Sequence, residues 1–190
     1  MPVPVHVLDF EGKLQSGIAE WGIVSLEGQK LIATRTQRCR LQDSSEEISG
    51  NCADFKENAA YFLQLRRTGI FCAHSCSVED NLLRSYWASP GYVPSFTSVS
   101  SVTTWGPWLD TCAIWMHMVP GLVSYNLMDL IQSYSLRDSL RQVASEYCPS
   151  GRAYPHAALY DALATSLLLR LAMRLVPQRT LEDWVFYSHA

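Results

Sequence analysis

The first 36 residues constrain the fold most strongly, because they contain three strand-like runs in close succession. Residues 3–8 form an apolar run rich in β-branched side chains, and residues 18–26 and 30–36 are predicted as two further strands. The last two are joined by Glu27-Gly28, a dipeptide typical of a hairpin turn. The opening of the chain therefore predicts an antiparallel three-strand meander.

The rest of the chain adds one short strand and a series of helices. Residues 70–73 are predicted as the strand, residues 88–108 and 149–155 as loops, and residues 109–118 resume an apolar pattern. Helices are predicted over residues 54–67, 78–87, 125–134, 136–147, 157–176 and 181–188. This order of elements predicts a single α/β domain over residues 1–190, in which helices flank a central mixed sheet.

Composition places the chain among ordinary globular proteins. Hydrophobic residues make up 48% of its 190 residues and charged residues 17%. No apolar run approaches the ~18 residues of a membrane span, and the N-terminus lacks the features of a signal peptide, so we expect a cytoplasmic protein without a membrane partner. The six cysteines are irregularly spaced, and buried, reduced thiols are favoured over a zinc site.

Net charge neither supports nor excludes a nucleic-acid partner. The formal charge of −3 is not that of a typical nucleic-acid-binding domain. However, four carboxylates gathered around bound metal would leave the remaining residues slightly positive. Arginines also outnumber lysines by twelve to three, and arginine binds phosphate through two parallel hydrogen bonds.

The first candidate site is Asp9-Phe10-Glu11, which ends the first predicted strand. Side chains alternate along a strand, so the two carboxylates project to one face and Phe10 to the other. Two neighbouring acids repel each other unless a cation or a proton intervenes, and a pair of hard divalent cations is one resolution. Taken alone, the pattern is more typical of a solvated strand end.

The second candidate site lies at the start of the helix predicted over residues 157–176. Asp161 lies at the N-terminal end of the apolar stripe of this helix, where an acid needs a partner. The helix dipole alone could provide the stabilisation. His156 lies just before the helix, in a loop position from which its side chain can reach a neighbouring site.

The third candidate site covers residues 73–83, where a short strand leads into a helix with an acidic first turn. Glu79 and Asp80 form that turn. Stabilisation of the helix N-terminus by negative charge is sufficient to explain either residue.

In this order the three sites resemble the motifs of the DEDDh 3′–5′ exonucleases, the family of polymerase proofreading subunits, ribonuclease T and oligoribonuclease. The family motifs are D-x-E, A-H-N-x-x-F-D-x-x-F-L and H-x-A-x-x-D-A. They correspond here to Asp9-Phe10-Glu11, to residues 73–83 and to residues 156–162. Residues 18–24 match an I-x-E-I-G-x-V segment, and Asp110-Thr111 matches a D-T pair. The resemblance covers nearly the whole chain and implies a ribonuclease-H-like fold.

The chain departs from the family pattern at three positions. Gly12 replaces the usual Thr, which leaves only backbone to contact the 3′ end of a substrate, and Ser75 replaces Asn. Glu79 occupies the position of the metal-binding Asp, with Asp80 one residue out of register. The neighbours of the motif, Val78 and Leu82-Leu83, favour Glu79. If the alignment with the family motif is shifted by one residue, Asp80 is the ligand instead.

The resemblance implies a 3′–5′ exonuclease that uses two Mg²⁺ ions, which Mn²⁺ can replace, and releases nucleoside 5′-monophosphates. The implied metal ligands are Asp9, Glu11, Glu79 and Asp161. His156 is the implied general base, and Phe10, Gly12 and His74 are the implied substrate contacts. Phe10 and Trp105 are candidates for stacking on terminal bases, although core packing explains most of the tryptophans.

Two alternatives stay open at this point. A protein with this fold can be a catalytically weak or inactive nucleic-acid-binding module, or a metal-free structural domain. The implied partner is a single-stranded or frayed 3′ end of DNA or RNA. A polymerase partner and a dimeric state are both compatible with the sequence.

Overall fold

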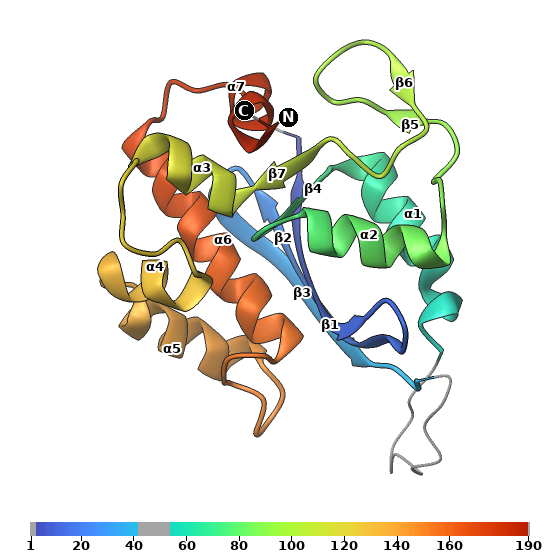
Figure 1. Cartoon of the computed structure of the whole chain (residues 1–190), viewed down its shortest axis with the longest axis horizontal. Helices are drawn as coiled ribbons and strands as arrows, with labels where there is room; N and C mark the ends of the chain where they lie inside the picture. Colours follow the sequence, from blue (N-terminus) through green and yellow to red (C-terminus); the bar gives the residue numbers. More distant parts are fainter. Residues whose placement is uncertain (1–2, 42–53, 190) are drawn as a thin grey trace.

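The computed structural model describes residues 3–41 and 54–189, which form a mixed five-stranded sheet flanked by helices (Figure 1). The strand order is β3-β2-β1-β4-β7. The strands are β1 (Val5–Lys13), β2 (Gly17–Glu27), β3 (Lys30–Arg38), β4 (Ile70–Ala73) and β7 (Trp108–Asp110). The first three pair antiparallel, whereas β4 pairs parallel to both β1 and β7. The predicted mixed sheet with an antiparallel meander is confirmed.

Seven α-helices cover the two faces of this sheet within the described residues. They are α1 (Ala59–Thr68), α2 (Ser77–Tyr86), α3 (Thr111–Met118), α4 (Leu127–Ser133), α5 (Arg137–Tyr147), α6 (Ala158–Leu175) and α7 (Leu181–His189). A short 3₁₀ helix, η1 (Phe55–Asn58), precedes α1. In Figure 1, α1 and α2 lie on one side of the sheet, and α3 to α6 lie on the other. Over the described residues, none of the helices is both long and apolar enough to span a bilayer.

The sheet separates two hydrophobic clusters, and the alternation of side chains along β1 assigns each residue to one of them. Val5 and Val7 pack in the cluster under α6, while Leu8 and Phe10 pack in an aromatic cluster under α1 and α2. Asp9 continues the Val5–Val7 face, because side chains two residues apart project to the same side. Asp9 is therefore directed toward α6.

The length of β1 corrects the prediction that the first strand ends at residue 8. β1 continues to Lys13, and its pairing with β2 extends over its whole length. The parallel pairing with β4 stops at Val7 opposite Cys72. Beyond Val7, β1 therefore has a strand neighbour on one edge only. Asp9 and Glu11, the polar residues that suggest a strand end, lie on this part of β1, which pairs with β2 but not with β4.

The segment 88–108, predicted as a surface loop, is partly ordered and partly buried. It contains a two-stranded ribbon, β5 (Val93–Pro94) with β6 (Ser101–Val102), and its Trp105 side chain is only 2% exposed. The buried guanidinium of Arg66 donates to the carbonyl oxygens of Pro94, Trp105 and Gly106 at 2.6–2.8 Å. These bonds hold the segment against α1.

A glycine allows α6 to cross the sheet at close range. A Cβ atom on Gly22 would lie 2.3 Å from the backbone nitrogen of Leu159 and 2.4 Å from the carbonyl carbon of Ala158. Gly22 is also the cross-strand partner of Asp9. The absence of a side chain at this position therefore brings the first turn of α6 close to Asp9.

We expect the buried histidine of β1 to make stability depend on pH. Burial lowers the pKa of His6 to about 4, and its Nδ1 lies 2.8 Å from the hydroxyl of Ser25. Because the unfolded chain binds this proton at its ordinary pKa of ~6.5, the contribution of His6 alone should lower the free energy of unfolding by about 3 kcal/mol between pH 6.5 and pH 4. The buried acids Glu79 and Asp161, whose pKa values are raised, act in the opposite direction in both proteins, so the difference between wild type and His6→Gln isolates the histidine. Urea denaturation should show a free energy of unfolding that changes less favourably from pH 6.5 to pH 4 in wild type than in His6→Gln. Equal changes in the two proteins would contradict the assignment.

Candidate active site

Four acidic side chains from three elements lie near one another around β1. Asp9 and Glu11 come from β1, Glu79 from the first turn of α2 and Asp161 from the first turn of α6. The pKa of Asp9 is raised well above its usual range, first by burial of its carboxyl group and then by the negative charges of Asp161, Glu79, Glu11 and Glu20. Residues that lie more than 150 positions apart in sequence are thus electrostatic neighbours.

Each of three elements contributes a buried carboxylate oxygen without a hydrogen-bond partner. Among the described residues, Oδ2 of Asp9, Oε2 of Glu79 and Oδ1 of Asp161 find no donor. Burial raises the pKa of Glu79 to about 8 and that of Asp161 to about 6. Buried oxygens of this kind are costly unless a proton or a cation satisfies them. The donor set, which consists only of carboxylate oxygens, fits a hard divalent cation such as Mg²⁺.

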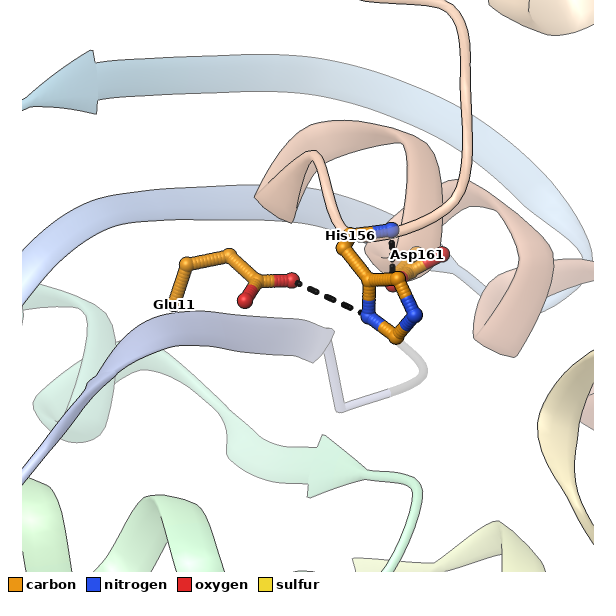
Figure 2. A group of neighbouring side chains, drawn as sticks. All are labelled: Glu11, His156 and Asp161. Carbon is orange, nitrogen blue, oxygen red and sulfur yellow. Dashed lines mark hydrogen bonds and ion pairs between the residues drawn. The ribbon is translucent and has the colours of Figure 1, made fainter.

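His156 lies beside Glu11 and Asp161 (Figure 2). Its side chain is 88% exposed, and its Nδ1 lies 4.0 Å from Oε1 of Glu11. Its backbone N–H donates to Oδ2 of Asp161 at 3.0 Å. One side-chain ligand atom from each of Glu11, His156 and Asp161 lies within 4.8 Å of the others. The left-handed backbone of His156, with φ of 65°, turns the chain sharply just before α6.

The structure places the two acids of α2 in different surroundings. Glu79 is 5% exposed and contributes to the field at Asp9. Asp80 accepts a hydrogen bond from the indole N–H of Trp108 at 3.0 Å and lies 3.6 Å from the guanidinium of Arg84. Glu79 therefore occupies the position that the motif register favours, and its role as a ligand stays a prediction.

Substitution of these two acids should separate their roles. Glu79→Gln keeps the size of the side chain and removes its charge, so we expect it to lose most of the activity and to weaken metal binding. Asp80→Asn keeps an acceptor for Trp108, so we expect near-normal activity and a loss of only a few tenths of a kcal/mol from the helix dipole. Activity and calorimetric metal titration measure both effects. An inactive Asp80→Asn beside a normal Glu79→Gln would identify Asp80 as the ligand.

A hydrogen-bond network behind the cluster orients the first turn of α2. Asp110 caps α3 and also accepts hydrogen bonds from the backbone N–H groups of Ser75 and Cys76, at 3.0 and 2.9 Å. His74 Nε2 bonds to the carbonyl of Tyr125 at 2.8 Å, and its Nδ1 bonds to the hydroxyl of Thr111 at 2.9 Å. Sequence reasoning found Asp110-Thr111 as a matching pair but gave it no role. The network links β7 to the loop that leads to Glu79.

The predicted substrate contacts differ in their surroundings. Phe10 is only 6% exposed, and its ring packs against Phe55 and Phe62 with centroid distances of 5.7 Å. Phe10 is therefore a core residue rather than a stacking platform for a base, because the alternation of β1 directs it away from the acids. The same correction applies to Trp105, which is buried against Phe71 and Trp87. Both ring nitrogens of His74 are engaged by protein groups, and its substrate contact stays a prediction.

Gly12 lies where β1 bulges, between Glu11 and Gly12. A Cβ atom at this position would lie 2.3 Å from the carbonyl oxygen of Gly17. The hairpin therefore excludes a side chain at residue 12, and the chain presents only backbone there, as the sequence predicts.

An open depression of about 480 Å³ adjoins the acids. Its lining includes Asp9, His74, Met116, Val123, Tyr125 and Leu127. Met116 and Val123 are exposed to solvent. The lining also includes the polar residues Ser75, Ser124 and Asn126. Asp9 therefore contributes an acidic group to a depression whose lining mixes polar and apolar residues.

No protein-family model matches the chain, and a search of curated proteins finds no match to its sequence. Solved structures do match. The chain is similar to Exonuclease X in complex with 5′-overhanging duplex DNA, with 19% identity and a TM-score of 0.69 over 97% of this chain and 99% of the other.

Two further matches extend the likeness. E. coli Exonuclease I in complex with a dT13 oligonucleotide has 14% identity and a TM-score of 0.65 over 96% of this chain, which spans 43% of that protein, and a zinc-bound form also matches. A 3′-exonuclease that recognises the 3′ end of a histone mRNA stem-loop has 12% identity and a TM-score of 0.61 over 92% of this chain and 83% of its own. The chain therefore has the ribonuclease-H-like fold of the DnaQ-type (DEDDh) exonucleases.

Proposed function

We propose that the chain is a metal-dependent 3′–5′ exonuclease that hydrolyses phosphodiester bonds at the 3′ end of DNA or RNA and releases nucleoside 5′-monophosphates. The observation that carries this proposal is the set of unpartnered carboxylate oxygens on Asp9, Glu79 and Asp161, with the exposed His156 beside them. Structural stability does not explain why three elements bring uncompensated acids together, because such burial is unfavourable. The exonucleases that share the fold, matched in complexes with DNA and with RNA, support the same conclusion.

The residues that would hold the metal are Asp9, Glu11, Glu79 and Asp161. Their oxygen donors suit two Mg²⁺ ions, which Mn²⁺ can replace. When bound, a pair of such ions activates the attacking water and neutralises charge on the leaving oxygen of an in-line displacement.

His156 would take the proton of the attacking water. An imidazole is the side chain that most often acts as a base near neutral pH, and this one is open to solvent on one side and to Glu11 on the other. The hydrogen bond from its backbone to Asp161 fixes where the side chain leaves the loop. Solvent exposure then lets the proton pass to bulk water after each turnover.

The depression beside Asp9 would receive the terminal nucleoside. The apolar residues of its mixed lining, Met116, Val123 and Leu127, suit the face of a base, which stacks without preference for sequence. The backbone at Gly12 is the candidate contact for the 3′ end. A partner of this kind is a single-stranded or frayed end, because a paired terminal nucleotide cannot enter a depression separately from its complement.

Single-stranded DNA and RNA labelled at either end test this proposal. We expect the 5′-labelled strand to shorten progressively, the 3′ label to leave as a mononucleotide, and both reactions to require Mg²⁺ or Mn²⁺ and to stop with EDTA. Fragments from internal cleavage, or cleavage that persists in EDTA, would contradict it. Tight binding without any cleavage would identify a nucleic-acid-binding module instead.

A further inference from the structure

An ion pair joins the loop that carries His156 to the central sheet. Arg152, in the loop between α5 and α6, donates through its guanidinium to the carboxylate of Glu20 on β2, across 132 residues of sequence. Glu20 is 7% exposed, so its carboxylate needs a partner. The guanidinium of Arg152 also donates to the hydroxyl of Tyr154 and lies 5.0 Å from the centroid of that ring. The pair therefore fixes the loop four residues before His156.

Glu20 is also the cross-strand partner of a predicted metal ligand. Glu11 and Glu20 lie opposite each other in the β1–β2 ladder, so their side chains project to the same face. Like charges directly opposite each other are unfavourable. The pKa of Glu11 is raised first by burial and also by Glu20, while His156 and Arg152 act in the opposite direction. Arg152 thus offsets the charge of Glu20 beside the site.

His156 itself has little side-chain support. Its imidazole is 88% exposed, and the nearest carboxylate oxygen, on Glu11, is 4.0 Å away. Its backbone bond to Asp161 involves a residue that metal binding would also engage. A fixed point elsewhere in the loop is needed if the imidazole is to stay beside the acids. Arg152 provides one that uses none of the four predicted ligands.

We propose that the Arg152–Glu20 pair is a positioning device that places His156 for the reaction and neutralises Glu20 so that it does not act as a fifth carboxylate at the metal site. This inference rests on the proposed function. Arg152 and Glu20 act through other residues and do not touch the reacting atoms. The two members of the pair carry opposite charges, so their removal has opposite consequences for the metal and the same consequence for the loop.

Three variants separate these consequences. Arg152→Ala leaves Glu20 as an uncompensated carboxylate near Glu11, so affinity for Mn²⁺ should become tighter. Glu20→Ala leaves an unpaired guanidinium near Glu11, so affinity should weaken by roughly tenfold. The double variant should return affinity toward wild type. In all three the loop is released, and kcat should fall on the order of 10²-fold with KM little changed, since small displacements near reacting groups have effects of this size.

Calorimetric Mn²⁺ titration of the full chain gives the affinities, and oligonucleotide hydrolysis gives kcat and KM. Arg152→Lys should restore affinity to the wild-type value and recover part of kcat, because it keeps the charge without the planar guanidinium. Arg141→Ala is the matched control. Arg141 pairs with Asp138 at 3.0 Å on an exposed face of α5, with both side chains largely in solvent, and its loss should change neither quantity.

Failure of this inference can be distinguished from failure of the proposed function. If wild type hydrolyses no nucleic acid, the function fails, and the opposite shifts in Mn²⁺ affinity still test the electrostatic part of this inference. If both single variants weaken Mn²⁺ binding in parallel with a fall in melting temperature, the pair only stabilises the fold, and the inference is overturned. Wild-type kcat in Arg152→Ala would also overturn it.

Discussion

Replacing Asp9 by Asn should abolish hydrolysis and, at the same time, raise the stability of the metal-free protein. Asp9 lies among Glu11, Glu79 and Asp161, and burial together with their negative charges raises the pKa of its carboxyl group well above the usual range. An amide of the same shape carries no charge, so both the cost of burying the carboxylate and its repulsion with its neighbours disappear. We therefore expect Asp9 to destabilise the metal-free fold, as a buried metal ligand without its ion would.

The same substitution should remove the response to metal. In wild type, Mg²⁺ at a hundred times its dissociation constant should stabilise the protein by about 2.7 kcal/mol, because the ion binds the folded state alone. Asp9→Asn should show almost none of this effect. Thermal unfolding with and without Mg²⁺ measures both changes, and Asp138→Asn on the exposed face of α5 serves as the control. A wild-type metal shift in Asp9→Asn would place the metal site elsewhere.

The antiparallel part of the fold follows from local sequence. The hairpin of β2 and β3 turns at Gly28, which has a φ of 59°. Hairpin turns favour glycine at a position with positive φ, so the sequence Glu27-Gly28 predicts the turn. The sequence predicts too early an end for β1, because Asp9 and Glu11 are polar residues typical of a strand end. Both side chains belong to the acidic cluster, while their backbone stays paired with β2. At Asp9 and Glu11, polar side chains therefore occur within a strand and not at its end.

Local sequence pattern alone does not predict that the residues of the candidate site come together. Asp9, Glu79 and Asp161 each have a sufficient local explanation as a strand end or a helix start, and only the order of the motifs indicated that they belong together. The approach of α6 to β2 depends on Gly22, which the motif contains but whose contact with Leu159 no periodicity indicates.

The Arg152–Glu20 pair could not be predicted from sequence, because it joins a loop to a strand 132 residues away. The ordered structure within residues 88–108 could not be predicted for a similar reason. A composition rich in Ser, Thr, Pro and Gly predicts a loop, and it does not indicate that a buried arginine from α1 binds three of its carbonyl groups.

The general base should be separable from the metal ligands. His156 Nδ1 lies 4.0 Å from Oε1 of Glu11, and one ligand atom of each of His156, Glu11 and Asp161 lies within 4.8 Å of the others. The same arrangement would allow the imidazole to bind metal directly. Loss of a general base lowers the rate of hydrolysis only, whereas loss of a metal ligand also lowers the affinity for the ion. Activity alone cannot distinguish the two roles, because either loss lowers turnover.

His156→Ala should lower kcat by about 10²–10⁴-fold, the usual contribution of a general base, while Mn²⁺ affinity stays within about twofold of wild type. Four carboxylates remain to hold the ions, and the backbone bond from residue 156 to Asp161 does not depend on the imidazole. Calorimetric titration beside single-turnover hydrolysis measures the two quantities, and His117→Ala on α3 is a histidine control outside the site. A fall in Mn²⁺ affinity that matches the fall in kcat would instead make His156 a metal ligand, and the proton would then have to leave directly to solvent.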